Sequence, residues 1–148
     1  MEKSYFKSPI GILEIVCENK KLISLKLVDK IEDTSYDTDF MKNIKFQLGE
    51  YFSGKRKKFN IKINPKGSDF QKKVWMELQK IPYGETKSYS QIAQNIGNKN
   101  AQRAVGAACN KNSILIIIPC HRVISKNGNL TGFACGIDVK EKLLKIEK

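Results

Sequence analysis

The sequence predicts a mixed α/β (α+β) fold, in which a small sheet-and-helix part is followed by a mainly helical part. In the first part, β-branched and apolar side chains gather in short runs or alternate with polar ones, which is typical of strands. From Ser68 onward, apolar side chains recur every three or four positions, which is the period of a helix. Residues 64–67 contain a proline and a glycine and predict a linker. We therefore expect an N-terminal α/β subdomain over residues 1–65 and a C-terminal domain over residues 66–148.

Three segments of the N-terminal part have the pattern of strands. Residues 5–17 and 22–28 are rich in β-branched and apolar side chains, and the polar residues 18–21 between them predict a hairpin turn. Residues 59–63 alternate apolar and polar side chains and predict a further strand.

One helix is expected between these strands. Residues 29–39 are acidic and lack periodicity, which predicts a surface loop. Apolar residues at helical spacing then predict a helix that begins at Phe40 and ends at Gly54. The basic run at residues 55–58 is either a solvated turn or a DNA contact, and the sequence leaves both interpretations open.

Capping signatures mark the first two helices of the C-terminal part. Ser68 with Gln71, and Ser88 with Gln91, each place a hydroxyl three residues before an amide, which is the pattern of a capping box. The first of these helices carries one apolar stripe and stops before the Pro82-Tyr83-Gly84 segment; the stripe consists of Phe70, Val74, Leu78 and Ile81.

The helix that starts at Ser88 is followed closely by another. Gly97 stands where a C-terminal cap is expected, and after a short turn Asn100 can cap a second helix that runs to about Asn110. Two short helices joined by a tight glycine-containing turn predict a helix-turn-helix. A final helix is expected over residues 139–148.

The second helix of this pair has almost no long polar side chains. Reading base edges in the major groove needs such side chains, so this helix is a poor major-groove reader. A smooth helix could lie against sugar and phosphate in the minor groove, or its small residues could simply allow tight packing. The small residues in question are Ala101, Ala104, Val105, Gly106, Ala107 and Ala108.

The charge of the chain is large and unevenly distributed. The net charge is +12, but residues 1–39 carry six basic and eight acidic side chains, so the excess lies entirely in residues 40–148. This asymmetry favours a polyanionic partner for the C-terminal part. No apolar run is long enough to span a membrane, and no signal-peptide pattern follows Met1, so a cytoplasmic protein without a membrane partner is expected.

The chain has four cysteines and one histidine, and none of the cysteines are paired at Cys-x-x-Cys spacing. A zinc site therefore has few ligands, and disulfides are not expected in a cytosolic chain of this size. We predict no bound metal.

Five aliphatic residues, 114–118, lead through Pro119 into Cys120 and the only histidine, His121. Such a run is usually buried, so Cys120 should lie at the edge of a dry core. Only the thiolate is a good nucleophile, and a nearby base would increase its fraction. Adjacent side chains point in different directions, so a bridging water or a third group would have to connect Cys120 to His121. On these residues alone, a buried structural cysteine is the more common interpretation, because buried structural cysteines outnumber catalytic ones.

Pro119-Cys120-His121-Arg122-Val123, with Asn112 eight positions upstream of Cys120, resembles the active site of the O6-alkylguanine-DNA alkyltransferases, also called methylated-DNA–protein-cysteine methyltransferases. The resemblance covers about residues 68–148, whereas the first 65 residues match only in general character. The further motifs that carry it are Tyr83-Gly84, Ser88-Tyr89, Ala101-Gln102-Arg103-Ala104-Val105-Gly106 and Thr131-Gly132-Phe133.

This resemblance implies DNA repair by direct alkyl transfer. An alkyl (methyl) group would pass from O6-alkylguanine, and also from O4-alkylthymine, in double-stranded DNA to Cys120. The transfer would be stoichiometric and irreversible, because a thioether does not easily revert to a thiolate, so each molecule acts once. No cofactor is implied, because the lesion is the donor and the protein is the acceptor. A monomer is expected.

The resemblance also implies the role of each catalytic residue. His121, oriented by Glu147, would take the Cys120 proton through water. Tyr89 would crowd the target phosphate during base flipping and direct its hydroxyl at a guanine ring nitrogen. Arg103 would enter the gap left by the extruded base. The same helix-turn-helix would contact DNA through Asn100, Ala104 and Gly106.

The substrate pocket implied by the resemblance contains Asn112, Arg122, Val123, Phe133, Ala134 and Cys135. The sequence departs from the common pattern at two of these positions. Phe133 stands where tyrosine is usual, and it can still stack on guanine. Cys135 stands where glycine is usual, which changes the expected shape of the pocket.

Two non-catalytic alternatives belong to a different functional class. An alkyltransferase-like protein that only marks lesions would also flip bases, but such proteins lack the cysteine that is present here at position 120. A regulator that binds DNA through the helix-turn-helix would leave Cys120 as a buried residue, and it would prefer a particular DNA sequence over a lesion.

Overall fold

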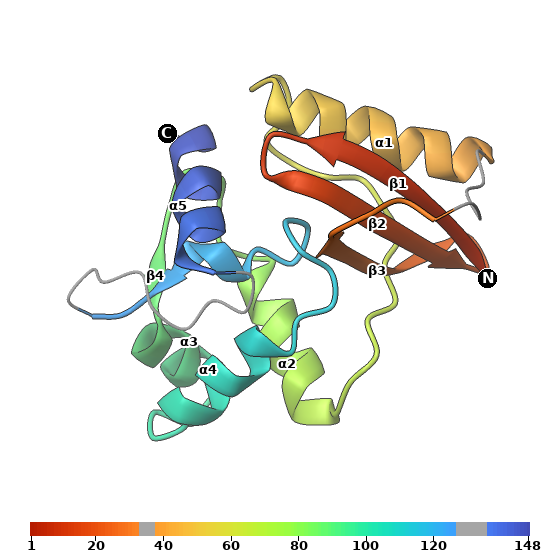
Figure 1. Ribbon diagram of the computed structural model, residues 1–148. Coiled ribbons are helices and arrows are strands. Elements are labelled where there is room, and N and C mark those ends of the chain that lie inside the picture. Colours follow the sequence, from red (N-terminus) through yellow and green to blue (C-terminus); the bar gives the residue numbers. More distant parts are fainter. Residues whose placement is uncertain (33–37, 127–135) are drawn as a thin grey trace. The chain divides into compact units, whose positions relative to one another are not determined.

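The computed structural model describes residues 1–32, 38–126 and 136–148. The chain divides into two compact units, Met1–Pro65 and Lys66–Lys148. The first contains a three-stranded sheet and one helix, and the second contains four α-helices with a short strand pair (Figure 1). The predicted α/β fold class is confirmed.

The sheet of the first unit consists of β1 (Glu2–Ser8), β2 (Gly11–Glu18) and β3 (Lys21–Val28), which are antiparallel in the order β1-β2-β3. The prediction of one strand over residues 5–17 is wrong, because the chain reverses within it. The Ser8 hydroxyl donates to the Gly11 carbonyl at 2.7 Å and accepts the Ile10 amide at 3.3 Å, which closes a two-residue turn. Gly11 has φ +129°, a value that suits a residue without a Cβ.

The second hairpin turn was predicted at residues 18–21 and is confirmed. Its two central residues, Asn19 and Lys20, have φ of +53° and +59°. Positive φ at both central positions defines a type I′ turn, whose twist matches that of the flanking strands. Asparagine tolerates this conformation better than most residues, which explains its place at the first position.

Helix α1 (Asp39–Phe52) lies along one face of this sheet (Figure 1). The Thr38 hydroxyl caps it by accepting the Met41 amide at 3.3 Å. The core between helix and sheet is fully buried and includes Leu13, Ile15, Leu25, Met41, Ile44 and Leu48.

The strand predicted over residues 59–63 is wrong: the segment makes one isolated bridge, between Leu22 and Ile63. Here a side chain makes the backbone hydrogen bonds that a neighbouring strand would otherwise make. Gln47 of α1 accepts the backbone N–H of Asn60 at 2.9 Å and donates to its carbonyl at 3.1 Å. The backbone groups of Asn60 are therefore satisfied although the segment does not join the sheet as a strand.

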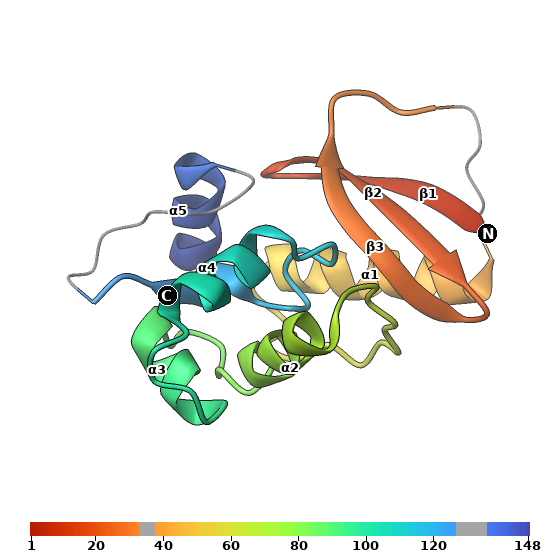
Figure 2. The same cartoon turned by 90° about the horizontal axis from the view of Figure 1, so that it is seen from below.

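The second unit begins with α2 (Asp69–Leu78), and the predicted capping box of Ser68 and Gln71 is confirmed in both directions. The indole N–H of Trp75 donates to the carbonyl of Ala108 at 2.8 Å, which joins α2 to α4 (Gln102–Asn110). Helices α2, α3 and α4 lie side by side (Figure 2).

Helix α3 (Tyr89–Asn95) and α4 form the predicted pair of short helices joined by a tight turn. The capping box of Ser88 and Gln91 is confirmed. Gly97 has φ +87°, its amide donates to the Gln94 carbonyl, and the next amide donates to Ala93, which is the bond pattern of a Schellman motif.

The N-cap predicted at Asn100 is wrong. Helix α4 begins one residue later, and its N-cap is Ala101, which has no side chain to accept a hydrogen bond. The preceding turn explains the shift: Asn98 accepts the Asn100 amide on its side chain at 3.2 Å and the Ala101 amide on its carbonyl at 3.0 Å.

The rest of the unit consists of short elements and one helix. Strand β4 (Lys87–Ser88) pairs in parallel with β5 (Val123–Ile124), and the 3-10 helix η1 (Cys120–Arg122) directly precedes β5. Helix α5 (Ile137–Ile146) starts and ends two residues before the predicted bounds. Within the described parts of the chain, every helix is too short or too polar to cross a membrane.

Candidate active site

The aliphatic run that precedes Cys120 is folded by two three-residue turns. The Ile117 amide donates to the Leu115 carbonyl at 2.8 Å, around Ile116 with φ +73°. The Cys120 amide donates to the Ile118 carbonyl at 2.8 Å. A β-branched residue at positive φ is a genuine backbone outlier, and such strain gathers at functional sites. The turns bring Cys120 into η1 with only 3% of its surface exposed.

Asn112 holds the sulfur of Cys120. Its side-chain carbonyl accepts the Ile114 amide at 2.9 Å, and its Nδ2 donates to the Ile118 carbonyl at 2.8 Å and to Cys120 Sγ at 3.2 Å. All three bonds fix the amide orientation, so an N–H points at the sulfur. A donor in that position stabilises the thiolate more than the thiol.

His121 and Glu147 form a buried pair, with 2.6 Å between His121 Nε2 and Glu147 Oε2. Burial, the largest influence, lowers the pKa of His121 below its ordinary value, so the imidazole is neutral at neutral pH. An ionised carboxylate only accepts, so Nε2 carries the proton and Nδ1 keeps a lone pair. Nδ1 is buried and has no hydrogen-bond partner among the described residues, which leaves it available as a base.

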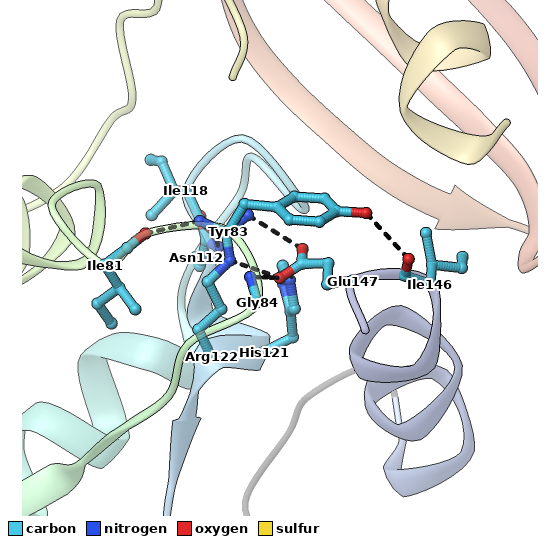
Figure 3. Close-up of polar contacts among 9 residues, drawn as sticks. All are labelled: Ile81, Tyr83, Gly84, Asn112, Ile118, His121, Arg122, Ile146 and Glu147. Carbon is cyan, nitrogen blue, oxygen red and sulfur yellow. Dashed lines mark hydrogen bonds and ion pairs between the residues drawn. The ribbon is translucent and has the colours of Figure 1, made fainter. Parts of the chain in front are cut away.

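Arg122 fixes Glu147 in place (Figure 3). Its Nε and Nη2 donate to the two carboxylate oxygens at 2.8 and 3.0 Å, and its Nη1 donates to the Ile81 carbonyl at 2.7 Å. The Gly84 amide adds a longer bond of 3.4 Å to Glu147. Bidentate pairing with arginine favours the ionised carboxylate.

The end of α5 is therefore held in position rather than frayed. Tyr83 contributes by donating its hydroxyl to the Ile146 carbonyl at 2.9 Å (Figure 3). Arg122, which the resemblance placed among the residues of the substrate pocket, is buried and pairs with Glu147. Its observed contacts are those of a residue that positions the carboxylate.

Tyr89 is half-buried at the first position of α3. Burial, followed by the nearby Cys109 and Cys120 sulfurs, raises its pKa to about 12. The phenol is therefore protonated at neutral pH and available as a donor. Its ring packs close to Gly106, where a Cβ would lie 3.9 Å from the ring.

Lys140 is a residue that the sequence interpretation missed. Its side chain is fully buried, and Nζ donates to the Val123 carbonyl at 2.6 Å and lies 5.8 Å from the Tyr89 ring centroid. A signal was present, because Lys140 lies three and four positions before Leu143 and Leu144, on the apolar stripe of α5. Lysine is normally read as exposed, so the spacing did not single it out.

The predicted DNA-contact residues lie on or near α4. Arg103, Ala104 and Asn100 are exposed, and Gly106 is half-buried. Of the predicted pocket residues, Val123 is buried, and its carbonyl already accepts from Lys140. Phe133, Ala134 and Cys135 lie outside the described residues.

In the described part of the chain, Cys17, Cys109 and Cys120 are buried and form no disulfide, and no group of three or more His, Cys, Asp or Glu side chains could hold a metal ion.

Two family models together match nearly the whole chain. Residues 1–65 match the ribonuclease-like domain of 6-O-methylguanine DNA methyltransferase, and residues 69–148 match its DNA-binding domain. This chain belongs to the 6-O-methylguanine DNA methyltransferase family. The predicted family and enzyme class are thereby confirmed.

Relatives of the family match over almost their full length. A methylated-DNA–protein-cysteine methyltransferase of Methanosarcina acetivorans is 45% identical, over 99% of this chain and 98% of its own. The protein of the same name from Methanosarcina mazei is 49% identical, over 96% and 94%. Among solved structures, Mycobacterium tuberculosis OGT in complex with DNA matches with a TM-score of 0.91 and 41% identity, over 100% of this chain and 93% of that one.

Proposed function

We propose that this family member repairs O6-alkylguanine in double-stranded DNA by transferring the alkyl group to Cys120, once per molecule. One arrangement carries the proposal: a sulfur that accepts an N–H from Asn112 is followed in the chain by a neutral histidine held by a buried carboxylate. A structural cysteine needs neither a donor aimed at its sulfur nor a buried base beside it.

The chemistry follows from these positions. The Cys120 proton would pass through a water molecule to His121 Nδ1, and Glu147 would stabilise the imidazolium that forms. The thiolate then attacks the alkyl carbon, so a carbon–sulfur bond forms while the bond between that carbon and O6 breaks. The electron pair of the broken bond goes to the base, where Tyr89 would donate its hydroxyl to a ring nitrogen. No cofactor enters this balance.

Access to the sulfur requires the damaged nucleotide to leave the stack, which costs a few kcal/mol. Arg103 suits this task because it is exposed in the first turn of α4, where its guanidinium can stack on the bases that remain. Asn100, Ala104 and Gly106 would contact the DNA beside it. The match of residues 69–148 to the family's DNA-binding domain supports placing both DNA binding and transfer in residues 66–148.

The test is mass spectrometry after mixing the protein with a duplex that contains one O6-methylguanine. One methyl group should appear on the Cys120 peptide, and the amount of repaired DNA should never exceed the amount of protein. Cys120→Ala should give no adduct, whereas Cys17→Ala, which alters a buried cysteine of the first unit, should react like the wild type. Multiple turnovers, or an adduct on another cysteine, would contradict the proposal.

A second duplex with O4-methylthymine tests the expected use of that lesion. A binding assay separates repair from regulation: the repair protein should prefer the lesion duplex over an undamaged duplex of the same sequence, and Arg103→Ala should reduce that preference.

The expected monomer and cytoplasmic location remain predictions. Size-exclusion chromatography with light scattering tests the first of them.

A further inference from the structure

Glu147 stands at a place where a helix gives its side chains little support. It is the C-cap residue of α5. The last carbonyls of a helix have no partners within it, and the negative end of the helix dipole opposes a carboxylate. The carboxylate that pairs with His121 therefore depends on groups outside α5 for its position.

Residues 81–84, which follow α2, supply two of these groups (Figure 3). The Tyr83 hydroxyl donates to the Ile146 carbonyl, one of the last carbonyls of α5, at 2.9 Å. The amide of Gly84 donates to Glu147 Oε1 at 3.4 Å. One short segment therefore contacts both the backbone of the last helical turn and the carboxylate itself.

The same segment also contacts Arg122, which holds both oxygens of that carboxylate. The Ile81 carbonyl accepts Arg122 Nη1 at 2.7 Å, and the guanidinium carbon lies 5.9 Å from the centre of the Tyr83 ring. A cation over an aromatic ring at such a distance is attracted to it. Tyr83 thus reaches Glu147 by two routes, through the end of α5 and through the arginine that pairs with the carboxylate.

The close approach at Gly84 leaves little room for a side chain. Its φ is +81°, and a Cβ at this position would lie 3.0 Å from the Glu147 carbonyl oxygen, which is shorter than an ordinary van der Waals contact. The backbone next to Tyr83 is therefore packed directly against the residue that holds His121.

We infer that Tyr83 is a positioning residue of the alkyl-transfer site, which fixes the Glu147 carboxylate and, through it, the tautomer and orientation of His121. It does so by holding the end of α5 and the guanidinium that pairs with the carboxylate. A displacement of about 1 Å, caused far from the reacting atoms, can slow a reaction by about 100-fold. The inference rests on the proposed function, because it concerns the base of that reaction.

A tyrosine that only stabilises the fold is the competing explanation, and Tyr83→Phe separates the two. The variant loses the hydroxyl and keeps the ring beside Arg122. Single-turnover methyl transfer from an O6-methylguanine duplex should be about tenfold or more slower, with unchanged DNA affinity. The matched control is Trp75→Phe, which also removes a side-chain donor from a backbone carbonyl of the second unit. It should lose similar stability and transfer at the wild-type rate.

The imidazole gives a readout that a loss of stability elsewhere does not change. The chain has one histidine, so in protein made without a histidine tag every imidazole NMR signal belongs to His121. In the wild type the Nε2 proton is buried against Glu147 and should exchange slowly with water. In Tyr83→Phe it should exchange at least about tenfold faster, because the last turn of α5 opens more often. Trp75→Phe should keep the wild-type exchange rate.

A double-mutant cycle tests whether Tyr83 acts through the carboxylate. In a Glu147→Gln background, Tyr83→Phe should slow transfer no further, because the contact that it supports is already lost. Independent effects would multiply instead. A further slowing as large as that in the wild-type background would overturn the inference.

Gly84→Ala is a second variant, which carries the test if Tyr83→Phe does not fold. Its methyl group should displace Glu147 and speed the exchange of the His121 Nε2 proton. The control is Gly54→Ala in the first unit, which has the same backbone strain at φ +80° but meets nothing within 4 Å. Equal exchange rates in these two variants would also overturn the inference.

The exchange measurements need no DNA, so failure of the inference and failure of the proposed function can be told apart. Faster exchange in Tyr83→Phe, in a protein whose wild type transfers no methyl group, would remove the proposed function and keep the support of the His121–Glu147 pair by Tyr83. Normal transfer by the wild type, with unchanged exchange in Tyr83→Phe, would keep the proposed function and overturn the inference.

Discussion

Replacing Glu147 with glutamine tests how the proposed base is held. The carboxylate accepts from His121 Nε2 at 2.6 Å and from Arg122 at 2.8 and 3.0 Å, all in a buried site. An amide of the same shape has one oxygen and one NH2 group. If its oxygen takes the place of Oε1, the NH2 group faces Arg122 Nη2 and also His121 Nε2–H, which forces the other imidazole tautomer. If its oxygen faces His121, two donors meet at Arg122.

The expected loss is large in both stability and rate. Removing one partner of a buried ion pair costs about 3–5 kcal/mol, because the other charge stays buried without compensation. For a chain of this size that corresponds to a melting temperature lower by about 6–20 °C. A misplaced or wrongly protonated base should also slow transfer by about 100-fold or more.

Thermal unfolding followed by circular dichroism, and single-turnover methyl transfer from an O6-methylguanine duplex, measure the two effects. The matched control is Glu141→Gln on the same helix, where an exposed carboxylate pairs with Lys145 at 3.4 Å. That pair should contribute at most about 1 kcal/mol. The reasoning fails if Glu147→Gln melts within about 2 °C of the control and transfers at the same rate.

Three further predictions concern stability. Burial lowers the pKa of His121 below 6.5, so on acidification the imidazole takes up a proton in the unfolded chain before it does so in the folded protein. The melting temperature should therefore fall between about pH 7.5 and 5.5. It should fall less in His121→Gln, which has no imidazole to protonate. Trp75→Phe removes the 2.8 Å bond to the Ala108 carbonyl, which keeps only the 3.2 Å bond from the Lys111 amide, and should cost about 1 kcal/mol in urea unfolding. Gly97→Ala places a side chain at φ +87° and should lower the free energy of unfolding by about 1 kcal/mol or more. Gly106→Ala lies within a helix, where the added Cβ meets only ordinary contact distances, so by the same measurement it should be neutral or slightly stabilising.

The parts of the fold that the sequence predicted are those fixed by neighbours along the chain. Both capping boxes, the type I′ turn at Asn19 and Lys20, and the glycine cap at Gly97 are local arrangements, in which each partner lies within a few residues of the other. The wrong predictions involve partners outside that range or turns without a strong signal. Gln47 makes two hydrogen bonds with the backbone of Asn60, 13 residues away in the sequence, and no local sequence pattern predicts them.

For the candidate site too, some contacts were predicted from the sequence and others were missed. The resemblance pointed to Glu147 near His121, and the structure places the two 2.6 Å apart. It did not indicate that Arg122 would hold that carboxylate, because the pair lies 25 residues apart in the sequence. Lys140 was missed for a different reason: a lysine on an apolar stripe is normally assumed to extend its head to water, and only packing on several sides shows that it does not.

The pairing of Arg122 with Glu147 changes what the other charges can do. Without that arginine, the carboxylate would be an uncompensated buried anion in the same site as the sulfur, and two negative charges at one site oppose each other's ionisation. With it, Glu147 can orient His121 and stabilise the imidazolium while adding little repulsion to the thiolate. We therefore expect Arg122 to influence the proposed nucleophile indirectly, by confining the charge of Glu147, the residue that holds the proposed base.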